Sequence, residues 1–376
     1  MPRSASRSAT SAPATRPAPP AGRHLRIGVV VDLHGPHGRA IAEGIASTPE
    51  RRSGTVCELL PLDIAPIRDE IPAFDAFIAE RGTPWLQAIA PVRPVVLIDD
   101  LFHPEGMHSI AMDHEATGQA AAALLQETAA EHFAFLQPAQ ATEQEAVPVR
   151  LCLKGFTAGL SEIAPGIRRD PPPPITVWTH GGFSHLARLL REAPRPIGIL
   201  AADDVLAIDL LRVCNRLGLT IPGEVAVAGI DDNQLLCHLA NPRLSSIATG
   251  YDRVAAEALR LATRLALGES SDGIRFRIPP GTVAARESTG HTEVDDPVLT
   301  RALACIRQQA RRGLHVDEVA AAAGVSRRTL EQRFRERLGT TASDEIARAR
   351  HALARKLLRH SDLSIERICE SLHTTP

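Results

Sequence analysis

Short apolar segments alternate with helical patterns along most of this sequence, and this alternation constrains the fold more than any other feature. The first segment is the unbroken apolar run 25–31, which Asp32 closes. Further strands are predicted at 76–78, 95–98, 109–112, 133–136, 175–178, 197–200 and 225–230. Helical patterns separate most of them, and short apolar strands covered by helices are what a parallel sheet buried on both faces requires. The sequence therefore predicts an α/β fold with enough units for two such sheets.

Acidic residues follow several of these predicted strands. The stretch 217–232 is the clearest case, because Gly218 is expected to end a helix and the next strand delivers Asp231 and Asp232 to its carboxyl end. Two parallel-sheet lobes that face each other would place the carboxyl ends of their strands around one cleft. Ligands bind at this position in such folds.

The C-terminal block 297–376 has a different character from the rest of the chain. It holds 15 basic and 9 acidic residues, a net charge of +6, whereas the whole chain carries −2. Only helical patterns are found in it. A basic helical block behind a mildly acidic body indicates a module that binds a polyanion.

A helix-turn-helix is predicted within this block. Residues 316–323 form an Ala-rich helix, Gly324 a tight turn, and Ser326 the N-cap of a second helix over 327–338. At about 100° per residue, Leu330 and Phe334 share one face of the second helix. The polar residues at 328, 331, 332 and 335 fall on the opposite side. That polar face is free to enter the major groove of DNA. The alternative interpretation is a helical dimerisation or capping unit with an arginine surface.

Two family resemblances follow from these motifs. Residues 25–289 resemble the sugar-binding domain of LacI-type repressors, which is itself similar to periplasmic binding proteins. The matching motifs occur in that family's order at 113–118, 203–207, 225–232, 242–247 and 286–289. The spacing of the C-terminal block resembles that of AraC-type transcription regulators. A LacI-like domain followed by an AraC-like module is the arrangement of the xylose operon regulators.

Residues 1–24 are mostly Ser, Ala, Pro and Arg with almost no bulky apolar residue, so we expect a disordered arm there. The resemblance implies a two-lobed sugar-binding domain (25–289), a linker (290–296) and a small all-α DNA-binding domain (297–376). It implies a cytoplasmic regulator of a pentose, xylose-like, utilisation operon, which is homodimeric and is not an enzyme. Its partners would be a double-stranded DNA operator and a small sugar, with no cofactor, no metal and no membrane.

Candidate binding residues also follow from the resemblance. By position, base reading falls on Arg328, Glu331 and Gln332, whose side chains suit guanine, cytosine and adenine edges respectively. Phosphate contacts fall on Arg327, Arg333 and Arg335. Sugars are held by Asp and Arg hydrogen bonds together with an aromatic ring. From their positions at or near the ends of predicted strands, we expect these roles for Arg39, Asp113, Asp204 and Asp231, with Phe102 and Trp178 as candidate rings. In the alternative interpretation, each aspartate caps the helix or turn that follows it, and Asp204 could equally be an N-cap.

The sequence departs from these families in two places. Three residues before Gly155, where the family usually has an arginine, this chain has Cys152, and Arg150 is out of phase by two. This departure bears on which sugar binds. The AraC-type module carries two helix-turn-helix units, whereas here the second unit ends after its first helix, 364–372. We expect a module without its second recognition helix, with weaker DNA binding than full-length relatives and a stronger dependence on dimerisation.

Several other function classes find no support. No apolar run approaches the roughly 18 to 20 residues of a membrane-spanning helix, and the arm lacks the apolar stretch of a secretory signal. The six cysteines lie far apart, as in a reduced cytosolic protein, and the loop histidines lack metal-ligand spacing. No phosphate loop or nucleophile motif occurs. A cytoplasmic sugar-binding protein without a DNA role and a sugar-processing enzyme are the alternatives.

Overall fold

The computed structural model describes residues 24–49, 54–62, 71–98, 107–139, 143–164, 167–168, 175–269, 273–291, 296–309, 313–361 and 363–372. The candidate ring Phe102 and nearly all of the arm 1–24 lie outside them. The chain forms two compact units. One comprises residues 1–113 and 250–279, and the other comprises residues 114–249 and 280–376.

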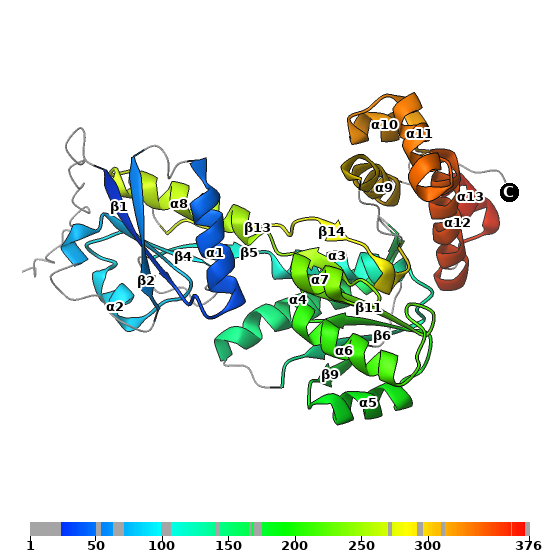
Figure 1. Ribbon diagram of the computed structural model, residues 1–376, viewed down its shortest axis with the longest axis horizontal. Coiled ribbons are helices and arrows are strands. Elements are labelled where there is room, and N and C mark those ends of the chain that lie inside the picture. The colour runs from blue at the N-terminus through cyan, green and yellow to red at the C-terminus, as the bar shows by residue number, and fades with distance from the viewer. Residues whose placement is uncertain are drawn as a thin grey trace, which may run out of the picture. The chain divides into compact units, whose positions relative to one another are not determined.

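The first unit is built on a six-stranded parallel sheet, which confirms the predicted α/β class. The strand order is β13 (Arg275–Ile278), β5 (His108–Met112), β4 (Val95–Ile98), β3 (Ala76–Ala79), β1 (Leu25–Val31) and β2 (Thr55–Pro61). Helices α1 (Pro36–Ser47) and α8 (Tyr251–Ala266) cover one face, and α2 (Pro84–Ile89) lies on the other (Figure 1).

Alternate side chains of β1 enter the two cores of this unit. Ile27 and Val29 pack with α1 and α8, whereas Val30 packs on the side of α2. All three side chains are at most 1% exposed. Burial on both faces explains why the strand reads as a continuous apolar run.

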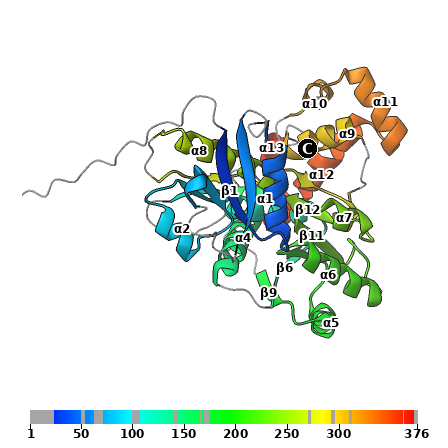
Figure 2. The ribbon, with the colours of Figure 1, turned by 60° about the vertical axis from the view of Figure 1, so that its left-hand side comes forward.

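The second unit contains another six-stranded sheet. Its order is β14 (Val283–Ala284), β12 (Ser245–Ala248), β11 (Val225–Asp231), β10 (Ile197–Ala201), β6 (His132–Gln137) and β9 (Ile175–Thr179). All neighbours are parallel except β12 and the edge strand β14, which are antiparallel. The helices of this part are α3 (His114–Gln126), α4 (Glu143–Ser161), α5 (Phe183–Glu192), α6 (Asp204–Arg216) and α7 (Gln234–Leu239). Figures 1 and 2 both show α6 beside β11. A small ribbon of β7 (Glu162–Ala164) and β8 (Ile167–Arg168) follows α4.

Helices α3 and α4 cross in direct backbone contact. A β-carbon at Gly155 would lie 1.9 Å from the carbonyl oxygen of Glu115, and one at Gly118 would lie 2.0 Å from that of Cys152. No larger side chain fits at this crossing, because real β-carbons do not approach within 3.0 Å of other heavy atoms. Cys152 is therefore part of a packed helix pair, and it is 4% exposed.

The C-terminal helices are α9 (Pro297–Gln309), α10 (Val316–Ala323), α11 (Arg327–Leu338), α12 (Ala342–His360) and α13 (Ile365–Leu372). The first three and the start of α12 pack around Leu330 and Phe334, as the helical pattern predicted. The rest of α12 packs with α13 in a separate cluster around Leu357, Ile368 and Leu372. Gly324 takes a left-handed conformation (φ 74°) at the end of α10, and the Ser326 hydroxyl accepts the N–H of Thr329 at the start of α11. Both predicted helix signals are confirmed. Among the described residues, no helix is long and apolar enough to cross a membrane.

Candidate functional sites

Strand β11 ends in a strained turn at the carboxyl edge of the second sheet. Asp231 (φ 111°) and Asp232 (φ 51°) both have positive φ, which is uncommon for residues other than glycine. Such strain concentrates at functional positions, where the surrounding contacts must hold it in place. The Asp231 side chain forms no hydrogen bond or ion pair with any residue that the structure describes. Burial, and next the carboxylates of Asp204 and Asp203, raise the pKa of Asp231 well above its ordinary range.

Asp204 lies beneath this turn and connects three elements. Its Oδ1 accepts the hydroxyl of Ser246 in β12 (2.6 Å), and its Oδ2 accepts the N–H of Asn233 (2.7 Å) and the thiol of Cys237 in α7 (3.4 Å). The residue is 1% exposed. The N-cap of α6 is instead its neighbour Asp203, whose Oδ1 accepts the N–H of Leu206 (2.7 Å).

Asp232 is held by a buried arginine. The Nη2 of Arg286 lies 2.8 Å from Asp232 Oδ1, with the two side chains 5% and 11% exposed. Arg286 also donates from Nη1 to the carbonyl oxygen of Leu244 (2.9 Å), and the N–H of Asp232 donates to the Ser246 hydroxyl (3.0 Å). The strained turn is thus fixed from two sides. The motif 286–289 carries part of the family resemblance, but the sequence alone does not predict that Arg286 pairs with Asp232.

The first unit contributes a second set of predicted residues. Asp32 follows β1 and accepts the N–H of His34 at Oδ1 (2.9 Å). Arg39, on α1, donates from Nη1 to the carbonyl oxygens of Leu33 (3.3 Å) and His34 (3.1 Å), so it supports this loop. Asp113 follows β5, and its N–H donates to the carbonyl oxygen of Ile278 (2.8 Å).

The candidate ring Trp178 lies in the core of the second unit, and Arg150 lies on the surface of α4. The indole of Trp178 is 5% exposed and packs in the same core as Leu186 and Leu190. Arg150 is exposed on α4. The other candidate ring, Phe102, lies outside the described residues.

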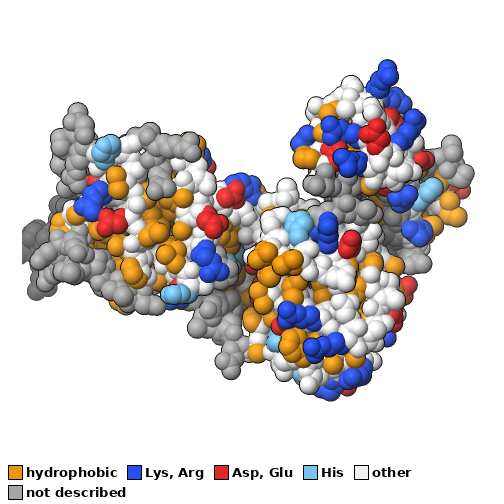
Figure 3. All heavy atoms as spheres, viewed as in Figure 1, with side chains coloured by type: hydrophobic (Ala, Val, Ile, Leu, Met, Phe, Trp, Pro, Cys, Tyr) orange, Lys and Arg blue, Asp and Glu red, His pale blue; other side chains and the backbone are white. Residues whose placement is uncertain are grey.

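Helix α11 turns a polar face away from its core. Leu330 and Phe334 are fully buried, whereas Arg328, Gln332 and Arg335 are exposed. The guanidinium groups of Arg328 and Arg335 have no partner among the described residues, and Gln332 donates to Glu336 Oε1 (2.8 Å). Lys and Arg side chains gather over this helical region in Figure 3. The face can meet a polyanion without breaking a buried contact.

The other three predicted DNA contacts are less free: Glu331 is half-buried, and Arg327 and Arg333 form ion pairs. Glu331 is half-buried, and its Oε2 is buried without a hydrogen-bond partner in the described part of the chain. Arg327 pairs with Asp317 (3.2 Å), but both side chains are more than half exposed, and such pairs contribute little. Arg333 pairs with Asp296 (2.6 Å), a partner that the sequence pattern of α11 does not indicate. Asp296 precedes Pro297, and an Asp–Pro step is a common start of a helix.

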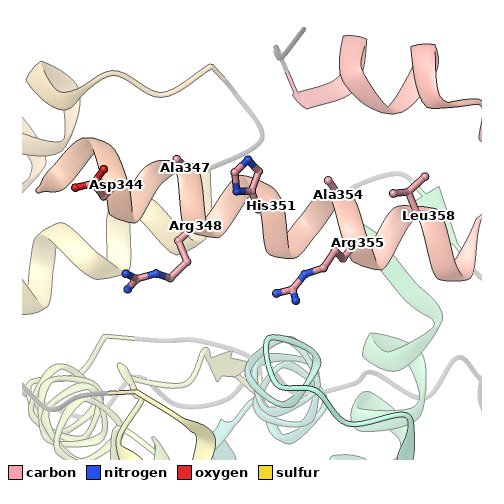
Figure 4. Close-up of a pocket in the computed structure, with 7 residues that line it drawn as sticks. All are labelled: Asp344, Ala347, Arg348, His351, Ala354, Arg355 and Leu358. Carbon is pink, nitrogen blue, oxygen red and sulfur yellow. The ribbon is translucent and has the colours of Figure 1, made fainter. Parts of the chain in front are cut away.

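Helix α12 adds a basic surface that was not predicted. A shallow groove of about 630 Å³ runs along one face of the helix, and Arg348 and Arg355 point to the same side of it (Figure 4). Arg348 pairs with Glu345 (2.6 Å), and Arg355 has no partner among the described residues. The remaining lining residues are Asp344, Ala347, His351, Ala354 and Leu358.

The Asp204 carboxyl group gives a pH prediction. Burial raises its pKa to about 6 from the ordinary 3.8, although three hydrogen bonds favour the charged form. The folded chain therefore holds this proton more tightly than the unfolded chain. The stability that the group contributes is fully present below pH 3.8 and is lost as the pH rises through about 6. At pH 7 the loss is about 3 kcal/mol.

Thermal unfolding of Asp204→Asn at several pH values tests this. Relative to the unaltered chain, the variant should gain stability as the pH rises from about 5 to about 7.5. Asp252→Asn, an exposed change on α8, should show no such trend. A difference between Asp204→Asn and the unaltered chain that stays constant over this range would contradict the assignment.

Comparison with known proteins gives consistent matches to both parts of the chain. Residues 131–289 match a periplasmic binding protein-like domain, and residues 319–373 match a helix-turn-helix domain. The xylose operon regulatory protein of Escherichia coli (strain K12) is 32% identical over 295 residues, which cover 76% of this chain and 74% of that protein. The protein of the same name from Haemophilus influenzae is 33% identical over 181 residues, 48% of this chain and 47% of that protein. A solved structure described as a xylose-binding transcription activator has 26% identity and a TM-score of 0.57, covering 94% of this chain and 92% of that one.

Proposed function

This chain belongs to the family of xylose operon regulatory proteins, and we propose that it regulates a pentose-utilisation operon in response to its sugar. It is a sugar-binding, DNA-binding transcription regulator and not an enzyme. The proposal adds that the effector is a pentose, that the active form is a homodimer, and that it acts in the cytoplasm, where its operator is found.

The exposed polar face of α11 is the observation that carries this proposal. Arg328 and Gln332 are exposed and lie on the side opposite the buried Leu330 and Phe334. An arginine pairs with the O6 and N7 of guanine, and a glutamine pairs with the N6 and N7 of adenine. Arg327 and Arg335 flank this face and suit the phosphate backbone, which positions the protein without reading sequence. Glu331 is the third proposed base contact.

On the sugar side, Asp231 is the best-supported contact. Its carboxylate has no partner among the described residues, and the turn that carries it is held by Arg286 and Ser246. A carboxylate fixed in this way can accept two hydroxyl hydrogen bonds, and its burial penalises analogues that leave it unpaired. Asp113 and Arg39 would add polar contacts and Phe102 a ring, while Asp204 would hold the turn in register.

Two binding measurements on the full chain test the proposal. Calorimetric titration with D-xylose, L-arabinose, D-ribose, D-glucose and D-galactose should show saturable binding of a pentose. Selection from a random-sequence duplex library should enrich a defined DNA site. Asp231→Asn should weaken sugar binding by about tenfold or more, because the amide nitrogen cannot accept the hydrogen bond that the replaced carboxyl oxygen takes from a sugar hydroxyl.

Three other results would each contradict a different part of the proposal. Binding of a hexose alone would overturn the pentose assignment. Sugar binding without enrichment of any duplex would favour a sugar-binding protein without a DNA role. Consumption of the sugar during the titration would favour an enzyme.

A further inference from the structure

The start of α9 and the recognition helix α11 are joined by one ion pair. The Nη1 of Arg333 lies 2.6 Å from Asp296 Oδ2. The Asp296 side chain is 5% exposed, whereas that of Arg333 is 40% exposed. The pair therefore lies at the edge of the helical core, with its acidic end inside.

The second oxygen of Asp296 is also occupied. Oδ1 accepts the N–H groups of Val298 (2.9 Å) and Leu299 (3.4 Å), so the side chain caps the first turn of α9. Burial alone would raise the pKa of Asp296, but the hydrogen bonds from Arg333 and these two amides outweigh it and the pKa lies below its ordinary value. The carboxylate is thus ionised at neutral pH and bonded to both α9 and α11.

Asp296 has a particular place in the chain. It is the last residue before α9, which opens the helical region at the point where the chain arrives from the sheet-containing part. Arg333 is in the middle of α11, one residue before the fully buried Phe334 and one after the exposed Gln332. A shift of Asp296 would therefore act on the helix next to its proposed base-reading residues.

We propose that Arg333 is a positioning residue that clamps the recognition helix to the entry of the DNA-binding region through Asp296, instead of contacting a DNA phosphate. This inference rests on the proposed function, because the clamp has a role only if α11 reads DNA. Its consequence is that the orientation of α11 depends on where Asp296 is held.

The two possible roles of Arg333 predict opposite effects of one substitution on DNA affinity. If Arg333 binds phosphate, Asp296→Asn removes a competing negative charge, so DNA affinity rises. If Arg333 is a clamp, Asp296→Asn loosens α11, so affinity for the selected duplex falls, by about tenfold. Asn caps helices as well as Asp does, so this variant retains the start of α9.

The salt dependence of binding separates the roles a second time. Each phosphate contact contributes about 0.9 to the slope of log affinity against log salt concentration. Arg333→Gln should leave this slope unchanged while weakening the selected duplex more than a random-sequence duplex. The matched control is Arg335→Gln on the same helix, whose side chain is exposed and has no partner among the described residues. It should lower the slope by about 0.9 and weaken both duplexes equally.

The experiment measures fluorescence anisotropy of the full chain and these variants on both duplexes, over salt concentrations from about 50 to about 200 mM. Circular dichroism confirms that each variant is folded. Higher affinity for Asp296→Asn, or a lower slope for Arg333→Gln, would overturn the clamp while leaving the proposed function intact. If the unaltered chain enriches no duplex, the proposed function fails and the clamp fails with it.

Discussion

Replacing Arg328 and Gln332 together with alanine is expected to remove sequence-selective DNA binding by α11. Both side chains are exposed on the polar face, and neither supports the core that Leu330 and Phe334 form. Each bidentate base contact is worth about 1–3 kcal/mol, so the loss of two corresponds to about 30-fold or more in affinity for the selected duplex. Affinity for a random duplex should fall far less, because only Arg328 carries a charge.

Arg337→Ala is the matched control for this variant. Arg337 is an exposed arginine of the same helix, but at about 100° per residue it lies about 340° from Leu330, close to the buried direction and away from the polar face. It should leave the selected duplex bound as before. Anisotropy titration of both variants at one salt concentration decides the matter. Unchanged selectivity in the double variant would mean that another surface reads the DNA.

Arg286→Met is expected to destabilise the second sheet-containing unit by about 3–5 kcal/mol. The change leaves Asp232 as an almost buried charge without its counter-ion, at 11% exposure, in a turn that already has positive φ. A loss of this size lowers the midpoint of thermal unfolding by roughly 10 °C for a unit of this length. Sugar binding should weaken as well, because Asp231 belongs to the same turn.

Two further variants identify the cause. Arg212→Met removes an exposed arginine, 63% accessible, from its pair with Asp209, and should cost under about 1 kcal/mol. Adding Asp232→Asn to Arg286→Met should recover part of the loss, because no uncompensated charge then remains. Calorimetric melting of the three proteins measures these effects. If the double variant is no more stable than Arg286→Met, the ion pair is not the source of the stability.

Features with a local cause were predictable from the sequence. Strand β1 is buried on both faces, so its unbroken apolar run identifies it as a strand in the sequence. Gly324 and Ser326 define the helix-turn-helix through the left-handed turn and the cap that these residue types favour. The polar face of α11 follows in the same way from the spacing of Leu330 and Phe334.

Features that depend on distant contacts were not predictable. Strand β2 lies at a sheet edge with Val56 and Leu59 exposed, and β13 pairs with β5, which lies far before it in the chain. Neither has the signal of a buried strand. The sequence placed Asp204 by its position after a strand, but its bonds to α7 and β12 require the folded sheet. The pairs of Arg286 with Asp232 and of Arg333 with Asp296 likewise join residues that local periodicity cannot connect.

We propose that sugar binding and DNA binding by this chain affect each other. The affinity of the full chain for its selected duplex, measured by anisotropy with and without a saturating amount of the pentose that binds, tests this most directly. We expect the sugar to change this affinity by about tenfold, within the range of about 1–3 kcal/mol typical of coupled sites. Equal affinity in the presence and absence of the bound sugar would contradict it.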